Sequence, residues 1–310
     1  MSELFDPSSL SRYSIRDRKH LVGVESFASA PPPPLSFADF LASLPDQLGA
    51  RNLRLAAAAV IEARRNDRPV HASMGAHVIK VGLAPVVADL LERKLWTGLS
   101  FNGAAVVHDL EIALIGRTSE DVAESISDGT FGFARETAEL YMEAARAAAR
   151  DGIGLGEAVG RLIEERELPY RRHSIFAAAW RLGVPATVHC AFGTDIVHMH
   201  PEMDPEALGR ATYTDFLRFA ALVARLSGGV YFNIGSAVVL PEVFLKALSM
   251  ARNAGLMDGP FTAVNMDMLP HYRPARNVLE RPGGVALDIR GHHEIMLPLL
   301  RAALLSAGEV

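Results

Sequence analysis

The sequence predicts an α/β fold, Rossmann-like, with a mainly parallel sheet that is covered by helices on both faces. The first observation is that short apolar runs alternate along the chain with longer segments of helical periodicity. The second is that these helical segments separate successive strands, which requires right-handed crossovers and therefore parallel pairing. The third is the number of clear strands, which is nearer six than the eight of a closed barrel.

The chain begins with a segment unlike the rest. Ser11–His20 is polar and basic, and Pro31–Pro34 must run as a stiff polyproline stretch. We expect residues 1–36 to form an N-terminal arm that packs over the domain or over a second subunit, or else a partly disordered tail. Residues 37–310 are expected to form a single Rossmann-like domain.

Each element of that domain has its own local signal. Short apolar runs predict strands at Val70–Met74, Gly98–Phe101, Pro185–Cys190, Val230–Ile234, Phe261–Asn265 and Val285–Ile289. Helical spacing predicts helices over Leu83–Leu95, from Val106, and over Ala134–Arg150, Ala158–Arg166, Ile175–Leu182, Pro241–Asn253 and Ile295–Leu305. Asp204 before Pro205 marks a further helix start, and Thr118 with Asp121 resembles a capping box.

Composition narrows the class of protein. The 31 basic and 36 acidic residues give a net charge of −5, which argues against a nucleic-acid partner. A single cysteine, Cys190, excludes a disulfide framework. The apolar runs fall far short of the roughly 20 residues that cross a bilayer, and Met1–Leu10 carries Glu3 and Asp6 where a secretory leader would be basic. We therefore expect a cytoplasmic protein with no membrane partner.

Ligand-binding residues are expected where the strands end, because open α/β sheets bind ligands beyond the carboxyl ends of their strands. Small residues there let backbone N–H groups approach a cofactor. The residues that follow the predicted strands and form a candidate cofactor site are Gly75, Asn102, Gly103, Ala104, Asp195, Gly235, Ser236, Asn265 and Asp267. The G-x-G-x-x-G fingerprint of ordinary dehydrogenases is absent.

Histidines and carboxylates at the same strand ends supply candidates for acid/base chemistry. We single out His108, Asp195, His198 and His271 as candidate catalytic residues. Asp109 beside His108 could share that role or could serve a helix start. An alternative is a metal site, for which His198, His200 and His292 would be the ligands.

The order of these loops resembles the deoxyhypusine synthase superfamily over about residues 70–282. Leu99–Ala105 followed by His108-Asp109-Leu110 resembles that family's strand, Thr-Ala-Gly-Gly loop and acidic helix start. Phe192–Asp195 resembles its Gly/Asp loop, Gly229–Ala237 its Gly-Gly-Gly loop, and Ala263–Asp267 with Arg273-Pro274 its Ile-Asn-Thr and Ala-Arg-Pro elements.

The resemblance implies a Rossmann-like fold and NAD bound between subunits of a homotetramer, with contacts from Asn102–Ala105, Asp195, Gly235-Ser236 and Asn265. That family oxidises spermidine and transfers an aminobutyl group to a protein lysine. Its catalytic lysine has no counterpart here, because Val278–Pro282 contains no lysine. The chain is thus expected to be a divergent relative with a different substrate.

Three functions follow from these observations. The leading one is an NAD-dependent transferase or oxidoreductase that acts, as a homo-oligomer, on a small polar substrate, a class that includes amines. The second is a metal-dependent hydrolase or lyase that uses the histidines. The third is a non-catalytic nucleotide-binding protein. Lys80 could replace the missing family lysine if its side chain points into the cleft.

Overall fold

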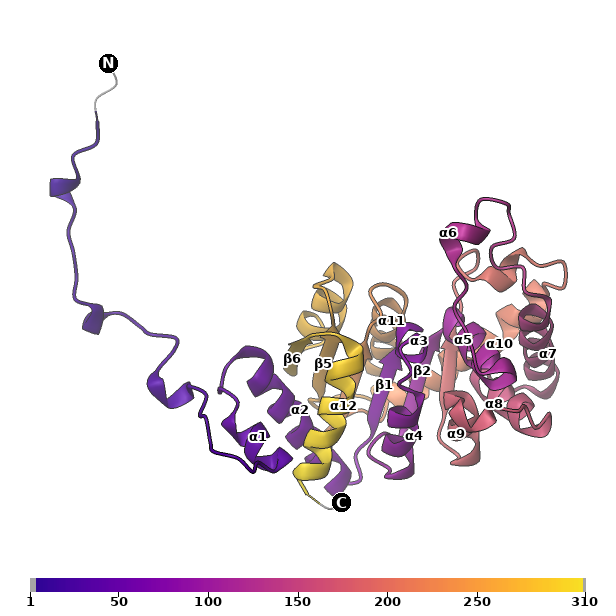
Figure 1. Ribbon diagram of the computed structural model, residues 1–310, viewed down its shortest axis with the longest axis horizontal. Helices are drawn as coiled ribbons and strands as arrows, with labels where there is room; N and C mark the ends of the chain where they lie inside the picture. The colour runs from indigo at the N-terminus through magenta and orange to yellow at the C-terminus, as the bar shows by residue number, and fades with distance from the viewer. Residues whose placement is uncertain (1–3, 309–310) are drawn as a thin grey trace.

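A computed structural model describes residues 4–308, so residues 1–3 of the predicted arm and residues 309–310 of the predicted domain lie outside the description. All strand pairings in the described sheet are parallel, and the strand order is β3-β2-β1-β4-β5-β6 (Figure 1). The strands are β1 (Val70–Met74), β2 (Gly98–Asn102), β3 (Ala186–His189), β4 (Val230–Ile234), β5 (Thr262–Asp267) and β6 (Val285–Arg290). The predicted fold class and all six strands are confirmed.

Helices connect these strands as the periodicity predicted. The principal helices are α1 (Phe37–Ser43), α2 (Leu48–Arg65), α4 (Ala84–Glu92), α5 (Gly103–Ile115), α7 (Arg135–Asp151), α8 (Leu155–Glu165), α9 (Ile175–Arg181), α10 (Pro205–Val223), α11 (Val239–Asn253) and α12 (His293–Ser306). Short helical turns occur at α3 (His77–Lys80), α6 (Val122–Ser125), η4 (Arg171–His173), η5 (Ile196–Met199) and η6 (Pro274–Glu280). No helix in residues 4–308 is long and apolar enough to span a membrane.

The two faces of the sheet differ in chemistry. Alternate residues such as Val230, Phe232 and Ile234 join the main core, which α2, α4 and α12 cover on one face. On the other face, beneath α10, buried polar side chains are hydrogen-bonded across strands: His71 Nε2 lies 2.8 Å from Ser100 Oγ, which lies 2.6 Å from the Thr187 hydroxyl. Burial on both faces is what a parallel sheet with crossover helices requires.

The N-terminal arm runs away from the domain (Figure 1). Residues 4–36 contain only the short turns η1 (Pro7–Ser9), η2 (Ile15–Asp17) and η3 (Val24–Ser26) before Ser36 caps α1. Large apolar side chains along it are exposed, among them Phe5 and Leu21. The arm contacts its own domain only near its end, where Ser26 accepts hydrogen bonds from Asp46 and Gln47 and the Ser29 amide donates to Ser43.

One predicted helix start is corrected. Asp121 caps α6 by accepting hydrogen bonds from the amides of Ala123 and Glu124, at 3.0 and 3.3 Å. Thr118 takes no part in that cap, because its hydroxyl is hydrogen-bonded to Glu111 and His108. The spacing matched a capping box, but the Thr118 hydroxyl is used in a tertiary contact instead.

Candidate functional site

The strand order places a switch point between β1 and β4. From β1 the chain builds outward through β2 to β3, and from β4 it builds in the opposite direction through β5 to β6. Gly75 follows β1 and Gly235 follows β4, and a Cβ added to Gly75 would lie 2.2 Å from the Gly235 carbonyl oxygen. Gly235 also has a φ of +63°, which favours glycine. Ligands bind at such switch points, so the two predicted glycines lie where the fold expects them.

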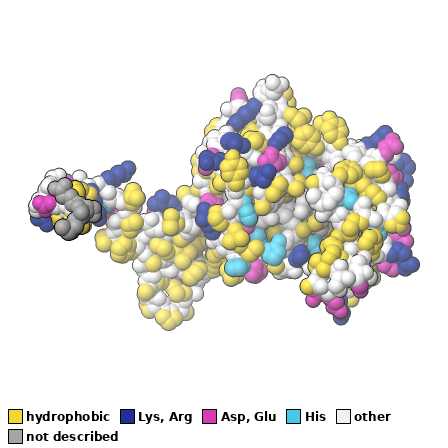
Figure 2. Space-filling view, turned by 90° about the horizontal axis from the view of Figure 1, so that it is seen from above, with side chains coloured by type: hydrophobic (Ala, Val, Ile, Leu, Met, Phe, Trp, Pro, Cys, Tyr) yellow, Lys and Arg dark blue, Asp and Glu magenta, His cyan; other side chains and the backbone are white. Residues whose placement is uncertain are grey.

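Buried polar atoms without partners gather at this carboxyl edge. Among the described residues, such atoms at or just beyond the strand ends belong to Asn102 (Oδ1), Asp195 (Oδ2), His198 (Nε2), Asn233 (Oδ1) and His293 (Nδ1). Figure 2 looks onto this side of the molecule and shows histidine side chains spread across its middle. Because an unsatisfied buried polar atom costs about 1–3 kcal/mol, such a concentration indicates that the edge awaits a ligand.

The start of α5 brings three predicted residues together. Asn102 stands at the N-cap position, yet its side chain makes no capping hydrogen bond. A Cβ on Gly103 would lie 2.0 Å from Asp195 Oδ2, so only glycine lets the helix approach that carboxylate. Burial raises the pKa of Asp195 to about 6, and a hydrogen bond from the Ala104 amide works against that rise.

His108 is held in one tautomer by a relay of hydrogen bonds. Thr118 donates its hydroxyl hydrogen to Glu111 Oε2 over 2.5 Å, so its oxygen accepts from His108 Nδ1 over 2.6 Å. His108 Nε2 is then left with its lone pair. Burial, helped by the nearby Lys80 charge, lowers the pKa of His108 to about 4, so the ring is a neutral proton acceptor. The orientation of the ring suits a general base, and the low pKa limits the strength of that base.

Asp109, the neighbouring carboxylate, has a structural role instead. It is fully buried and accepts hydrogen bonds from the Ser174 hydroxyl and from the Ile175 amide at 2.8 Å. Burial raises its pKa to about 6. Asp109 therefore ties α5 to the start of α9 and does not face the site.

His198 and His200 hold the loop that follows β3. His198 Nδ1 accepts hydrogen bonds from the amides of Gly193 and Asp195, at 3.1 and 3.2 Å, so its available Nε2 carries a proton. His200 Nε2 lies 2.8 Å from the carbonyl oxygen of Gly132. His198 can thus donate a hydrogen bond at Nε2, whereas His200 joins two loops.

The other half of the edge carries the predicted residues of β5. Asn265 receives a 2.9 Å hydrogen bond from Asn233 and is buried inside the sheet. Asp267 accepts from the Met268 amide at 2.7 Å, and His271 Nε2 lies 3.9 Å from the same carboxylate oxygen. Since β5 is separated from β2 by β1 and β4, His271 does not share a pocket with His108. Ser236 Oγ accepts from the Leu240 amide at the start of α11.

The structure also places at this edge several residues that were not among the predicted site residues. His77 and His293 meet edge-on over the switch point with ring centroids 5.6 Å apart, and His293 is almost fully buried. The sequence could have indicated Asn233, which lies inside an otherwise apolar strand. A single amide side chain in a buried strand needs hydrogen-bond partners. Lys80 lines the same small pocket as His108 and Asp195.

The predicted metal cluster does not form. His198 and His200 lie in the loop after β3, and His292 lies after β6, so the opposite edge strands of the sheet separate them. His292 is exposed and lies 3.8 Å from Glu294. Residues 4–308 contain no group of three or more His, Cys, Asp or Glu side chains placed to hold a metal ion.

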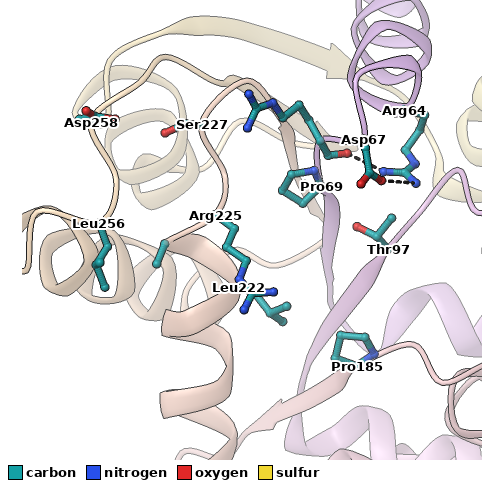
Figure 3. Close-up of a pocket in the computed structure, with 12 residues that line it drawn as sticks. Arg64, Asp67, Pro69, Thr97, Pro185, Leu222, Arg225, Ser227, Leu256 and Asp258 are labelled. Atoms are coloured by element: carbon teal, nitrogen blue, oxygen red, sulfur yellow. Dashed lines mark hydrogen bonds and ion pairs between the residues drawn. The ribbon is translucent and has the colours of Figure 1, made fainter.

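A larger cavity, of about 700 Å³, lies at the opposite, amino edge of the sheet (Figure 3). The guanidinium group of Arg64 already has protein partners there, since it pairs with Asp67 and donates hydrogen bonds to the carbonyl oxygens of Lys94 and Arg68. The Thr97 hydroxyl donates to Val70. None of the buried unpartnered polar atoms in the described chain belongs to this cavity.

Comparison with known proteins adds evidence on the fold. No protein-family model and no curated protein matches this chain. Among solved structures, AgrE in a ternary complex with ornithine and NAD⁺ is similar, with 13% identity over 82% of this chain and a TM-score of 0.54. The chain covers 33% of AgrE, about a third of its length.

Two smaller proteins are also similar. A conserved LOR/SDH protein from Methanococcus maripaludis S2 has 16% identity, a TM-score of 0.51 and coverage of 83% of this chain and 70% of that one. A candidate deoxyhypusine synthase from Entamoeba histolytica has 11% identity, a TM-score of 0.53 and coverage of 87% and 93%. At these identities the likeness shows a shared fold alone.

Proposed function

We propose that this chain is an enzyme that binds NAD at the carboxyl edge of its sheet and uses His108 as the acid/base group on a small polar substrate. The observation that carries the proposal is the series of unpartnered buried polar atoms along the carboxyl edge of the sheet, from the loop after β3 to the β1–β4 switch point. AgrE, of which about a third is similar in fold to this chain, was solved as a ternary complex with ornithine and NAD⁺.

The residues present fit such a cofactor. Gly75 and Gly235 bring backbone close together at the switch point, and the unpartnered oxygen of Asn102 lies at the open start of α5. Asn265 and Asp267 lie on the far side of the switch point. Bound NAD would supply a hydride acceptor or donor. His108 would hold or release a proton at Nε2 beside it.

Asp195 was expected to serve both cofactor and catalysis. It lines a cavity of about 180 Å³, below the 300–1,000 Å³ typical of drug-sized ligands. A dinucleotide needs more room than that, so we assign Asp195 to the substrate and leave the cofactor to the glycine loops and Asn102.

Calorimetry with NAD⁺ tests the proposal. We expect Asn102→Ala to weaken NAD⁺ binding about two- to tenfold, because one neutral hydrogen bond contributes roughly 0.5–1.5 kcal/mol. Asn66→Ala is the matched control, since Asn66 bonds to Glu62 at the end of α2, away from the carboxyl edge. A wild-type protein that gives no binding signal with NAD⁺ or NADH would overturn the proposal.

A further inference from the structure

The small pocket beside His108 is built from several separate segments. Lys80 comes from the end of α3, His108 and Glu111 from α5, Glu120 and Phe131 from the loops around α6, and Thr194–Ile196 from the loop after β3. Its volume of about 180 Å³ suits a molecule smaller than an ordinary drug-sized ligand.

One carboxylate in this pocket has an oxygen without a partner. Glu111 accepts hydrogen bonds from the hydroxyls of Thr118 and Thr137, and Glu120 accepts from the Gly132 amide. Asp195 is 8% exposed, and its Oδ2 has no hydrogen-bond partner among the described residues. A buried carboxylate of this kind favours a cationic partner.

The pocket is also lined by one positively charged side chain that has no partner among the described residues. Lys80 makes no hydrogen bond or ion pair with any residue in the range 4–308, and its charge acts on His108. Lys80 therefore lies more than 4.0 Å from the carboxylates of Asp195, Glu111 and Glu120, the distance within which ion pairs are counted. Opposite charges line one small pocket without neutralising each other.

A ligand that carries both charges satisfies both groups at once. Its ammonium group would donate a hydrogen bond to the unpartnered Oδ2 of Asp195, and its carboxylate would pair with Lys80. A ligand without an ammonium group would leave the buried Asp195 carboxylate unpaired, which costs affinity, and a ligand without a carboxylate would lose its contact with the exposed Lys80. The neutral ring of His108 lines the same pocket, with an unprotonated nitrogen that can accept a hydrogen bond from an ammonium group.

We propose that this pocket binds a small zwitterion of the amino-acid class, with the ammonium group on Asp195 and the carboxylate on Lys80. The inference rests on the proposed function in treating this pocket as the substrate site.

The test begins with calorimetry of the standard amino acids and L-ornithine against the NADH-loaded full-length protein, with the apoprotein in parallel. The tightest ligand is then compared with two matched molecules: the amine it gives on decarboxylation and the acid it gives on loss of its amino groups. We expect each to bind about ten- to a hundredfold more weakly than the amino acid, since each loses one charge-assisted contact.

Two variants separate the contacts. Lys80→Met should weaken the amino acid about tenfold and leave the decarboxylated amine unchanged, whereas Asp195→Asn should weaken both. Lys80→Met also keeps the aliphatic stem, and melting temperatures confirm that both variants fold. Equal affinities for the amino acid and its amine, or no binding by any amino acid while NADH binds, would overturn the inference alone. Failure of NADH itself to bind would instead overturn the proposed function.

Discussion

At the scale of single residues, His108 shows how neighbours decide chemistry. The histidine is neutral because burial and the Lys80 charge both disfavour the protonated ring, and the Glu111–Thr118 pair directs its one proton to Nδ1. The imidazole is therefore unprotonated at physiological pH, and its Nε2 can accept a hydrogen bond. The sequence pattern around His108 did not predict its contacts with Lys80, Glu111 and Thr118.

The Lys80 charge can be removed without disturbing the relay. We expect Lys80→Met to raise the pKa of His108 above its value of about 4, because the positive ring no longer meets a second positive charge. The pKa should stay below the ordinary 6.5, since burial is the larger cause of the shift. NMR titration of the His108 ring measures it directly, and an unchanged pKa would show that Lys80 points away from the pocket.

At the scale of elements, the loops after β1 and β4 depend on a glycine contact. Gly75→Ala should lower the melting temperature and weaken NAD⁺ binding, because its Cβ would lie 2.2 Å from the backbone oxygen of Gly235, which has little room to shift. Gly49→Ala on α2 is the control, since a Cβ there meets nothing within 4 Å. That control should stabilise by about 0.5–1 kcal/mol. Calorimetry and thermal unfolding of both variants decide the matter.

Asp215 is the link between α10 and the edge strand β3. Its Oδ2 accepts hydrogen bonds from the amides of Gly156 and Val188, at 3.0 and 2.8 Å, in the buried interior. Asp215→Ala leaves both amides unpaired, and we expect a loss of about 2–4 kcal/mol of unfolding free energy. Asp215→Asn keeps an accepting oxygen and should lose less; denaturant unfolding at pH 5 measures both.

The same aspartate makes stability depend on pH. Burial raises the pKa of Asp215 from 3.8 to about 7, so the folded state holds a proton that the unfolded state releases. Stability contributed by this group is therefore present at low pH and lost as the pH rises from about 4 to about 7. Asp215→Asn should flatten the unfolding free energy across that window. A wild-type profile that is as flat as the variant's across that window would contradict this assignment.

At the scale of the whole molecule, the arm stands out as the part without a partner. Residues 4–27 expose large apolar side chains, including Leu4, Tyr13 and Val24, away from the domain. Exposed apolar surface of this extent favours association. We therefore predict a homodimer or homotetramer in which another copy covers the arm.

Light scattering tests the assembly. We expect a mass of at least twice the 33.5 kDa of one chain at micromolar concentration, and a smaller mass when residues 1–27 are removed. The shortened protein should keep its melting temperature, because the arm adds no described contact to the sheet. A full-length protein that elutes as a monomer would rule out the assembly.

The sequence by itself determined the α/β class, the six strands and the edge at which polar residues collect. It could do so because strand burial and helical periodicity are local properties, and the rule for strand ends needs only their order. The positions of Gly75, Asn102 and Gly235 followed from that rule.

Only the tertiary structure decided which of those polar residues meet. His108, Lys80 and Asp195 come from three separate segments and share one pocket, whereas His198 and His292 lie beyond opposite edge strands. Thr118 matched a helix cap but serves His108. The strand order and the packing of loops set these distances, and both depend on contacts between residues far apart in the chain, which no local pattern records.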